Sequence, residues 1–377
     1  MSNSVLKIGF IGGGLNSSIG TTHKIASQMD GRWKLISGCF SAREKTNKET
    51  AATWDILPER THKTWKLMLE QERGELDAIA VLTPTPSHLE IVTTALELGY
   101  AVICEKTLAI SPREAIEINN TVKKHNSYLA VIYNYTGYPM VRELRTFIRE
   151  GHFGRITQIN IEMPQESFLK LGKNDSEPSP QQWRLHDNNI PIIGLDLGTH
   201  VHQLIDFLSS ERPLEVVAMN NSYGFFPNIV DNTVCMAKYS NNLDAQIWFS
   251  KSALGNSNGL RIRVYGDVGS AEWYQLEPDI LNLHDNKGKQ HVIERSCNDL
   301  RVADQARYNR FKAGHPTGFI EAFGNYYYDL ADDLRGFQEN GKRSSPWVFG
   351  GREALEGLLF LEAISKSSAK KSWINIG

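Results

Sequence analysis

Residues 8–20 read Ile8-Gly9-Phe10-Ile11-Gly12-Gly13-Gly14-Leu15-Asn16-Ser17-Ser18-Ile19-Gly20, a short apolar run that ends in a cluster of glycines. Gly12 permits a tight turn after a strand, and Gly14 lets the backbone approach a pyrophosphate at the start of the following helix. Ser17 stands where the GxGxxG pattern has its third glycine, and Gly20 follows three residues later. The position directly after a first apolar run favours a dinucleotide-binding loop over a loop that merely turns.

The first third of the chain alternates short apolar runs with amphipathic stretches. Apolar runs without polar alternation, separated by helical patterns, indicate a parallel sheet covered by helices on both faces. The predicted strands span residues 6–11, 34–40, 78–82, 101–104 and 129–133, and the predicted helices span 23–29, 43–54, 65–72, 88–98 and 112–125. This order predicts an α/β domain with a doubly wound parallel sheet, a Rossmann fold, over residues 1–135.

The pattern changes after about Tyr135, where apolar stretches follow turn signals such as Asn241-Asn242. Predicted strands at 155–162, 214–223, 233–239, 245–249, 260–265 and 270–273 indicate a second, α+β domain over residues 136–377. Its large open sheet should be mostly antiparallel, with helices at 194–208, 319–337 and 352–366 on one face and a loop at 171–180. The uncovered face predicts a homo-oligomer, a dimer or a tetramer, formed through this C-terminal sheet.

Composition excludes several classes of function. Lysine and arginine number 41 against 43 aspartates and glutamates, so the net charge of −2 predicts no partnership with nucleic acid or an anionic membrane. Four cysteines lie far apart without metal-binding spacing, and no metal site is expected. Residues 1–8 resemble neither a signal peptide nor a transit sequence, and no apolar run approaches membrane-spanning length. These features predict a cytoplasmic protein.

Two further stretches carry side chains suited to chemistry. Glu105-Lys106 follows the apolar run 100–104, and a lysine beyond the carboxyl end of a buried parallel strand lies where open α/β sheets bind ligands. In the predicted helix 194–208, Asp196 and His200 are four residues apart and project from one face. His202 points elsewhere, so we interpret it as a structural histidine.

The end of the second predicted strand bears on the choice between NAD and NADP. The segment 38–43 has no carboxylate to bind both ribose hydroxyls, as an NAD-selective site would have. Ser41 and Arg43 are able to hold a 2′-phosphate instead, which favours NADP modestly. The alternative is that Ser41 caps the next helix while Arg43 is solvated.

These pieces together resemble the Gfo/Idh/MocA family of oxidoreductases, named after glucose-fructose oxidoreductase, inositol dehydrogenase and MocA, over nearly the whole chain. The motifs that carry the resemblance are the glycine loop, Thr83-Pro84-Thr85-Pro86-Ser87-His88, Glu105-Lys106, Asp196-Leu197-Gly198-Thr199-His200, the run 134–143 and Trp183-Arg184. The chain departs from the family pattern at Ser17 in the loop, at Thr107, which replaces a proline, and at Gln203, which replaces an aspartate.

The resemblance implies roles for individual residues. Lys106, Asp196 and His200 would form the catalytic group. Glu105 and Lys106 would lie by the nicotinamide of an NAD or NADP cofactor. The residues expected to contact the cofactor are Gly12, Gly14, Leu15, Asn16, Ser41, Arg43, Thr83, Pro84, His88, Glu105, Lys106, Asn134, Trp183 and Arg184.

The resemblance and these residues predict an NAD(P)-dependent dehydrogenase or reductase that acts on a polyhydroxylated small molecule, namely a sugar, a cyclitol or a sugar derivative. Such a reaction needs a base for the hydroxyl proton and a donor for the reacting oxygen. His200 suits the base and Lys106 the donor, and the reverse assignment stays open. The alternatives are a catalytically silent nucleotide-binding sensor and an enzyme that retains and recycles its bound cofactor.

Overall fold

The computed structural model describes residues 4–376, so the first three residues of the segment considered for a leader lie outside it. The chain forms two compact units. The first unit comprises the chain up to Gly137 together with Phe319–Leu355, and the second comprises Tyr138–Gly318 together with the chain from Glu356 onward. The chain first passes from one unit to the other after Gly137, two residues beyond the predicted boundary after residue 135. A single boundary does not describe the two units, because residues 319–355 return to the first unit.

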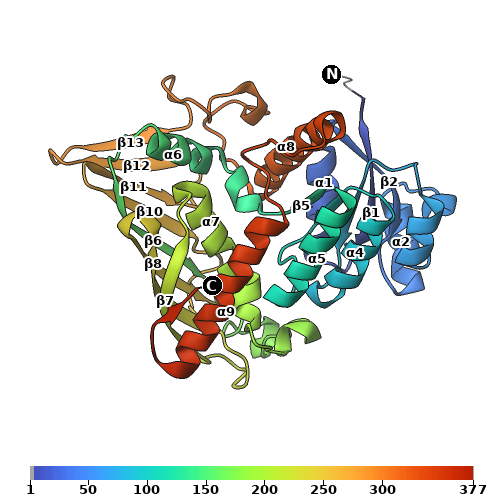
Figure 1. The fold of residues 1–377 in the computed structure, drawn as a ribbon, viewed down its shortest axis with the longest axis horizontal. Coiled ribbons are helices and arrows are strands. Elements are labelled where there is room, and N and C mark those ends of the chain that lie inside the picture. The colour runs from blue at the N-terminus through green and yellow to red at the C-terminus, as the bar shows by residue number, and fades with distance from the viewer. Residues whose placement is uncertain (1–3, 377) are drawn as a thin grey trace. The chain divides into compact units, whose positions relative to one another are not determined.

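The first unit is built on a five-stranded parallel sheet in the order β2-β1-β3-β4-β5. Its strands are β1 (Leu6–Gly12), β2 (Trp33–Cys39), β3 (Ala78–Leu82), β4 (Val102–Cys104) and β5 (Leu129–Val131). The helices between them are α1 (Gly20–Gln28), α2 (Glu44–Thr53), α3 (Trp65–Gln71), α4 (His88–Glu97) and α5 (Pro112–His125), and Figure 1 labels α1, α2, α4 and α5. The predicted doubly wound sheet is confirmed.

Local sequence signals fix the ends of α5, the helix that the pattern predicts best. Ser111 is its N-cap and accepts a hydrogen bond from the Glu114 N–H, and Pro112 occupies the first turn, where its missing N–H costs nothing. Asn126 ends the helix in the left-handed conformation, with φ of 45°.

Helix α8 (Phe319–Asn340) belongs to the first unit, although the sequence pattern placed it over the second sheet. Right-handed crossovers put α1 on one face of the parallel sheet and α4 and α5 on the other, because the strand order reverses after β1. Helix α8 contacts β2 and β5: the Trp33 Nε1–H donates to the Tyr327 carbonyl at 2.9 Å, and the Tyr326 hydroxyl donates to the Val131 carbonyl at 2.6 Å. Amphipathic spacing predicts a helix, but it does not say against which sheet the apolar side packs.

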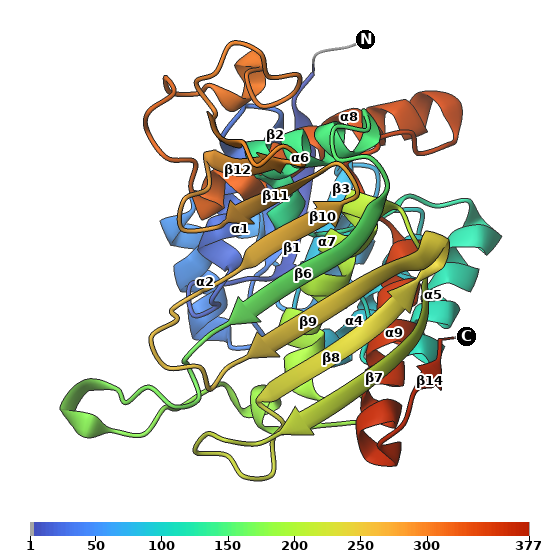
Figure 2. The same cartoon turned by 90° about the vertical axis from the view of Figure 1, so that its left-hand side faces the viewer.

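The second unit contains a nine-stranded sheet in the order β13-β12-β11-β10-β6-β9-β8-β7-β14. Figure 2 shows this order from β12 to β14. Only β6 and β9 pair in parallel among these strands, which confirms the predicted large and mostly antiparallel sheet. The strands are β6 (Ile156–Pro164), β7 (Pro213–Asn221), β8 (Asn232–Tyr239), β9 (Leu243–Ser250), β10 (Arg261–Gly266), β11 (Gly269–Tyr274), β12 (Ile280–Asp285), β13 (Gln290–Glu294) and β14 (Ile374–Asn375). The sequence pattern did not predict β12, β13 or β14.

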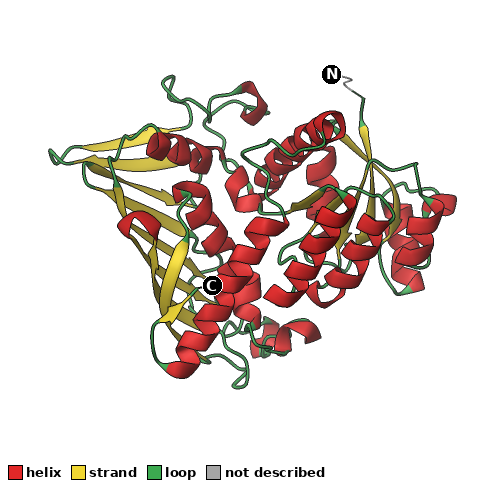
Figure 3. Cartoon of the chain, in the orientation of Figure 1, coloured by secondary structure: helices red, strands yellow, loops and turns green. Residues whose placement is uncertain are grey.

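Helices α6 (Pro139–Arg149) and α7 (Thr199–Ser209) belong to the second unit, as does α9 (Gly351–Lys370) from Glu356 onward, and Figure 3 colours the helices red and the strands yellow. Along β8, Cys235, Ala237 and Tyr239 are buried while Val234 and Met236 alternate with them and are exposed. This period of two shows that one face of the sheet packs and the other carries exposed apolar side chains. Within residues 4–376, no helix has the length and apolar character required to cross a membrane.

Candidate active site

The carboxyl ends of the first unit's strands meet at one edge of the parallel sheet. The register pairs Gly12 with Leu82, Val81 with Cys104, and Cys104 with Val131. The glycine loop, Thr83-Pro84, Glu105-Lys106 and the turn at Asn134 therefore leave the sheet at the same edge. This edge, beside the reversal of strand order between β1 and β3, is where open α/β sheets bind ligands.

The glycine loop follows β1 and is closely packed against its neighbours. Gly12 and Gly13 have φ of +83° and +74°, which side chains rarely adopt. A Cβ on Gly14 would lie 2.9 Å from the Phe40 carbonyl oxygen, and one on Gly20 would lie 1.6 Å from the Gly13 carbonyl oxygen. Gly20 thus provides the close contact between helix and loop for which the GxGxxG pattern uses its third glycine.

Side chains of the loop and of α2 hold it in this conformation. The Ser17 hydroxyl accepts hydrogen bonds from the Ile19 and Gly20 N–H groups, both at 3.3 Å. The Leu15 N–H donates to Thr50 Oγ1 at 3.1 Å, and the side chains of Leu15 and Asn16 are exposed at the sheet edge. Ser17, read as a departure from the pattern, therefore stabilises the turn.

The segment after β2 presents Ser41 and Arg43. The Ser41 hydroxyl accepts a hydrogen bond from the Arg43 N–H at 3.1 Å, while Arg43, not Ser41, occupies the N-cap position of α2. The Arg43 side chain is exposed. Its neighbour Glu44 has a pKa below the usual value because Lys48 binds its carboxylate at 2.7 Å, so this acid already has a counter-ion.

Glu105 forms a buried chain of hydrogen bonds that sequence reasoning missed. Its carboxylate lies 2.9 Å from His23 Nε2, and His23 Nδ1 lies 2.8 Å from the Tyr327 hydroxyl. His23 and Tyr327 are buried, on α1 and α8 respectively. Tyr327 belongs to an aromatic run typical of a helix core, and its contact with His23 arises only when α8 returns to the first unit.

His88 holds two of the strand-end loops together. Its Nε2 lies 2.8 Å from the Thr83 carbonyl oxygen, and its Nδ1 lies 2.9 Å from the Thr107 carbonyl oxygen. Complete burial lowers the pKa of His88. The ring is therefore placed beneath the loops, next to the half-buried Lys106, instead of lining a surface. The peptide bond between Lys106 and Thr107 is cis.

Asn134 begins the short turn Asn134–Gly137 after β5. The side chain is buried, and its Nδ2 has no hydrogen-bond partner among residues 4–376. Buried polar groups are normally paired, so an unpaired amide at a ligand-binding edge indicates a group that a ligand completes.

The second unit carries the other predicted catalytic residues. Asp196 lies in a π-helical turn, Gly194–Gly198, and His200 lies in the first turn of α7. The sequence predicted one regular helix over 194–208, and the π turn changes the angular relation between the two side chains because it adds a residue per turn. His200 is buried, and Asp196 is half-buried.

Arg184 and Lys251 bind the carboxylate of Asp196. Arg184, in the turn Gln182–Leu185, pairs with its Oδ2 through Nη1, and its guanidinium lies 4.4 Å from the centre of the Trp183 ring. The Lys251 ammonium lies 2.6 Å from the same Oδ2. Lys251 is buried, and no motif in the sequence distinguished it from other lysines.

His202 is buried in the second unit and stacks on Phe360, with ring centres 5.0 Å apart and ring planes at 27°. Burial lowers its pKa to about 4. Gln203, at the position where the family pattern has an aspartate, is also buried. These surroundings fit the interpretation of His202 as a packing residue.

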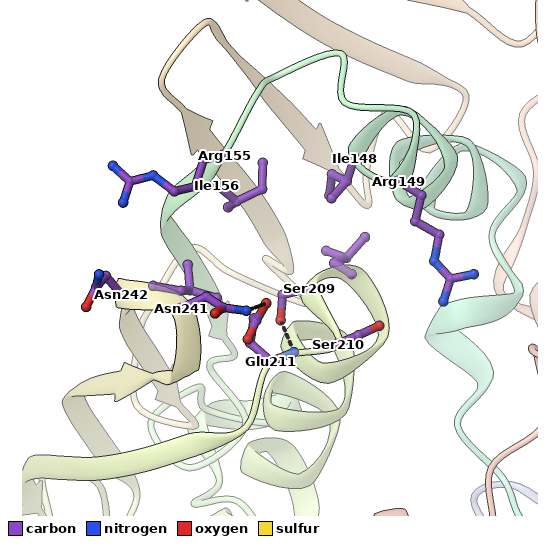
Figure 4. A pocket seen from close by; sticks show the side chains of 11 residues that line it. Ile148, Arg149, Arg155, Ile156, Ser209, Ser210, Glu211, Asn241 and Asn242 are labelled. Atoms are coloured by element: carbon purple, nitrogen blue, oxygen red, sulfur yellow. Dashed lines mark hydrogen bonds between the residues drawn. The ribbon is translucent and has the colours of Figure 1, made fainter.

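A hollow of about 510 Å³ lies at the far end of α7 from His200 (Figure 4). Its lining includes Arg149, Arg155, Ser209, Glu211 and Asn241, and the Asn241 amide donates to Glu211 at 2.8 Å. None of the predicted site residues lines it, so we do not assign it to the candidate site.

A glycine turn at the carboxyl edge of a doubly wound sheet, with a lysine beside it, defines a nucleotide-binding α/β protein. Residues 6–133 match the family model described as an oxidoreductase family with an NAD-binding Rossmann fold, and residues 141–272 match the GFO/IDH/MocA C-terminal domain. The chain belongs to the Gfo/Idh/MocA family of oxidoreductases, which confirms the resemblance.

Similar proteins span almost the whole chain. An uncharacterized oxidoreductase of Bacillus subtilis, YfiI, is 26% identical over 98% of this chain and 96% of its own. Levoglucosan dehydrogenase of Pseudarthrobacter phenanthrenivorans is 24% identical over 98% of both chains. An inositol dehydrogenase homolog from Azotobacter vinelandii, whose crystal structure contains NADH and myo-inositol, is 25% identical, covers 99% of this chain and 98% of its own, and superposes with a TM-score of 0.88.

Gly20→Ala should distort the glycine loop, because the new Cβ would meet the Gly13 carbonyl oxygen. We expect dinucleotide affinity to fall by about tenfold, equivalent to about 1.4 kcal/mol, measured by titration calorimetry. The control Gly336→Ala adds a Cβ 3.6 Å from the Ser344 hydroxyl, in the interior of α8, and should leave affinity unchanged. Wild-type affinity in Gly20→Ala would contradict this role.

The buried His202 should make stability depend on pH. Between the unfolded pKa of about 6.5 and the folded pKa of about 4, the unfolded chain binds more protons, so stability falls as pH falls. This contribution is on the order of 3 kcal/mol across that window. In His202→Gln, denaturant unfolding should show a shallower loss of stability from pH 6.5 to 4. His152→Gln, which removes an exposed histidine, is the control, and equal slopes in both variants would refute the burial effect.

Proposed function

We propose that the protein is an NAD(P)-dependent oxidoreductase that transfers a hydride between the nicotinamide and a secondary alcohol or ketone of a sugar, a cyclitol or a sugar derivative. The observation that carries the proposal is the position of Lys106 at the sheet edge that also bears the glycine loop. The names of the levoglucosan and inositol dehydrogenases support the substrate class.

The residues present fit a dinucleotide. The positive φ of Gly12 and Gly13 and the close approach of Gly14 to Phe40 leave a cradle without side chains, and Asn134 offers a buried amide that is unpaired among residues 4–376. The remaining proposed contacts are Leu15, Asn16, Ser41, Arg43, Thr83, Pro84, Glu105, Lys106, Trp183 and Arg184. When bound, the cofactor supplies a hydride acceptor or donor.

The protein's own residues manage the proton. In alcohol oxidation, His200 takes the hydroxyl proton, and Lys106 donates a hydrogen bond to the reacting oxygen. Asp196 orients the substrate or His200. In the reverse assignment, Lys106 is the base and His200 donates the hydrogen bond to the reacting oxygen.

Glu105 and His88 are proposed to act through Lys106. The chain from Glu105 through His23 to Tyr327 fixes the residue before the lysine, and His88 holds the carbonyl of the residue after it. Fixing the backbone on both sides of Lys106 narrows the region that its flexible side chain reaches, which supports a role in orientation-dependent catalysis. A catalytically silent sensor would have no use for this arrangement together with Asp196 and His200.

The exposed apolar residues Met219, Val234 and Met236 support pairing of the open sheet with a second copy of the chain. A homo-oligomer stays a prediction, and light scattering at micromolar concentration that returned the monomer mass of 42.5 kDa would refute it.

Cofactor reduction measured over a panel of sugars, inositols and their acids, with both NAD and NADP, tests the proposed reaction. Lys106→Ala and His200→Ala should each lower kcat on the best substrate by about a hundredfold or more, because each removes acid-base catalysis. The Kd of the reduced cofactor, measured by fluorescence, should change little. His202→Ala should have a much smaller effect on kcat, and near-wild-type turnover in both active-site variants would exclude this site.

The choice of cofactor gives a separate test. With no acidic side chain in 38–43 and Glu44 paired with Lys48, we expect NADP to bind more tightly than NAD. Arg43→Ala should weaken NADP binding by about tenfold or more through loss of a charge-assisted hydrogen bond, and should leave the Kd of NAD unchanged. Arg113→Ala, which removes an exposed arginine of α5, is the control. Binding of NAD at least tenfold tighter than NADP by the wild type would overturn the preference.

A further inference from the structure

Lys251 is a buried lysine immediately after β9, and its backbone is fixed on both sides. Its N–H donates to the Asp231 carbonyl at 2.7 Å, and its carbonyl accepts from the Phe168 N–H at 2.8 Å. Asp231 is itself fully buried, and its carboxylate accepts hydrogen bonds from the N–H groups of Tyr223 and Gly224. The Cα of Lys251 therefore has little freedom to move.

The side chain leads from this fixed point to Asp196. Its ammonium lies 2.6 Å from Asp196 Oδ2 and 5.3 Å from the centre of the Phe168 ring, with only 7% of the side chain exposed. Burying an ammonium is expensive unless an opposite charge compensates it. A lysine in this position is explained by the carboxylate that it binds.

Arg184 binds the same oxygen, but it is held by a loop and not by the sheet. It stands in a short turn at the end of the loop 165–181, with 21% of its side chain exposed. Lys251 stands at the end of a strand within the nine-stranded sheet. Of the two cations, Lys251 is the one whose position the sheet determines.

We propose that Lys251 is a positioning residue that fixes the carboxylate of Asp196 in the orientation used in the reaction. The inference rests on the proposed function, because it assigns Asp196 to the reaction site. Lys251 touches neither substrate nor cofactor in this role. It acts by holding the Asp196 carboxylate in place from the sheet, on the oxygen that Arg184 also binds.

Lys251→Met tests the proposal, because methionine keeps much of the side-chain volume and removes the charge. We expect kcat/KM to fall by about ten- to a hundredfold, the cost of a displaced catalytic group, with the Kd of the reduced cofactor unchanged. The acid limb of the pH–rate profile should move to higher pH, because the carboxylate loses a buried counter-charge. Lys251→Arg, which restores the charge, should recover part of the rate and return the acid limb toward its wild-type position.

Lys366→Met is the matched control. Lys366 also pairs with a carboxylate at 2.6 Å, that of Glu362 on α9, but 55% of its side chain is exposed. This variant should keep wild-type kcat/KM and pH profile. If Lys251→Met does not reach a folded state, as judged by near-ultraviolet circular dichroism, Lys251→Gln replaces it, with the same expected shift of the acid limb.

A double variant separates positioning from general damage. If Lys251 acts through Asp196, adding Lys251→Met to Asp196→Asn should lower kcat/KM by less than threefold further. Fully multiplicative losses, or a wild-type rate and pH profile in Lys251→Met, would overturn the inference. Absence of hydride transfer by the wild type with every tested alcohol and both cofactors would instead refute the proposed function, so the two failures are distinguishable.

Discussion

The parallel register of β1, β3, β4 and β5 is the constraint on which the candidate site depends. Because these strands run in one direction and end level with one another, each apolar run delivers its following residues to the same edge. The glycine loop, the Thr83-Pro84 turn, Glu105-Lys106 and the Asn134 turn are far apart in the sequence and become neighbours for this reason. The same edge exposes the amino end of α1, where an anionic group is favoured.

Buried polar side chains then fix the loops that the register brings together. His88 spans two strand ends, and His23 joins Glu105 to Tyr327. In the second unit, the ion pair with Lys251 fixes the carboxylate of Asp196 in a similar way. Burying any of these polar side chains without its partner would cost free energy. The hydrogen bonds and ion pairs therefore favour one conformation of the loops over others in which the partners separate. Precision at the site comes from this layer of contacts beneath it.

Particular elements show where sequence patterns suffice and where they fail. Helix α5 is predicted at both ends, because Ser111, Pro112 and Asn126 are local signals. Strand β13 was not predicted because its residues are almost all polar or exposed, which is typical of the sheet edge that it occupies. Helix α6 was also missed, although Pro139 in its first turn is a start signal, because buried Arg142 and Glu143 interrupt its apolar pattern. The buried carboxylate of Glu143 accepts hydrogen bonds from the N–H groups of Arg301, Val302 and Ala303, which lie in a loop distant in the sequence. These hydrogen bonds compensate its burial.

The sequence alone determined the fold class, the position of the glycine loop and the residue types of the candidate site, because these depend on short-range periodicity and on motifs of adjacent residues. It did not determine that α8 completes the first unit, that Gly20 replaces the missing third glycine, or that Lys251 binds Asp196. Those facts depend on contacts between residues far apart in the sequence, such as His23 and Tyr327, which are 304 positions apart. Only the folded chain brings such residues within hydrogen-bonding distance, so tertiary structure decided how the site is held.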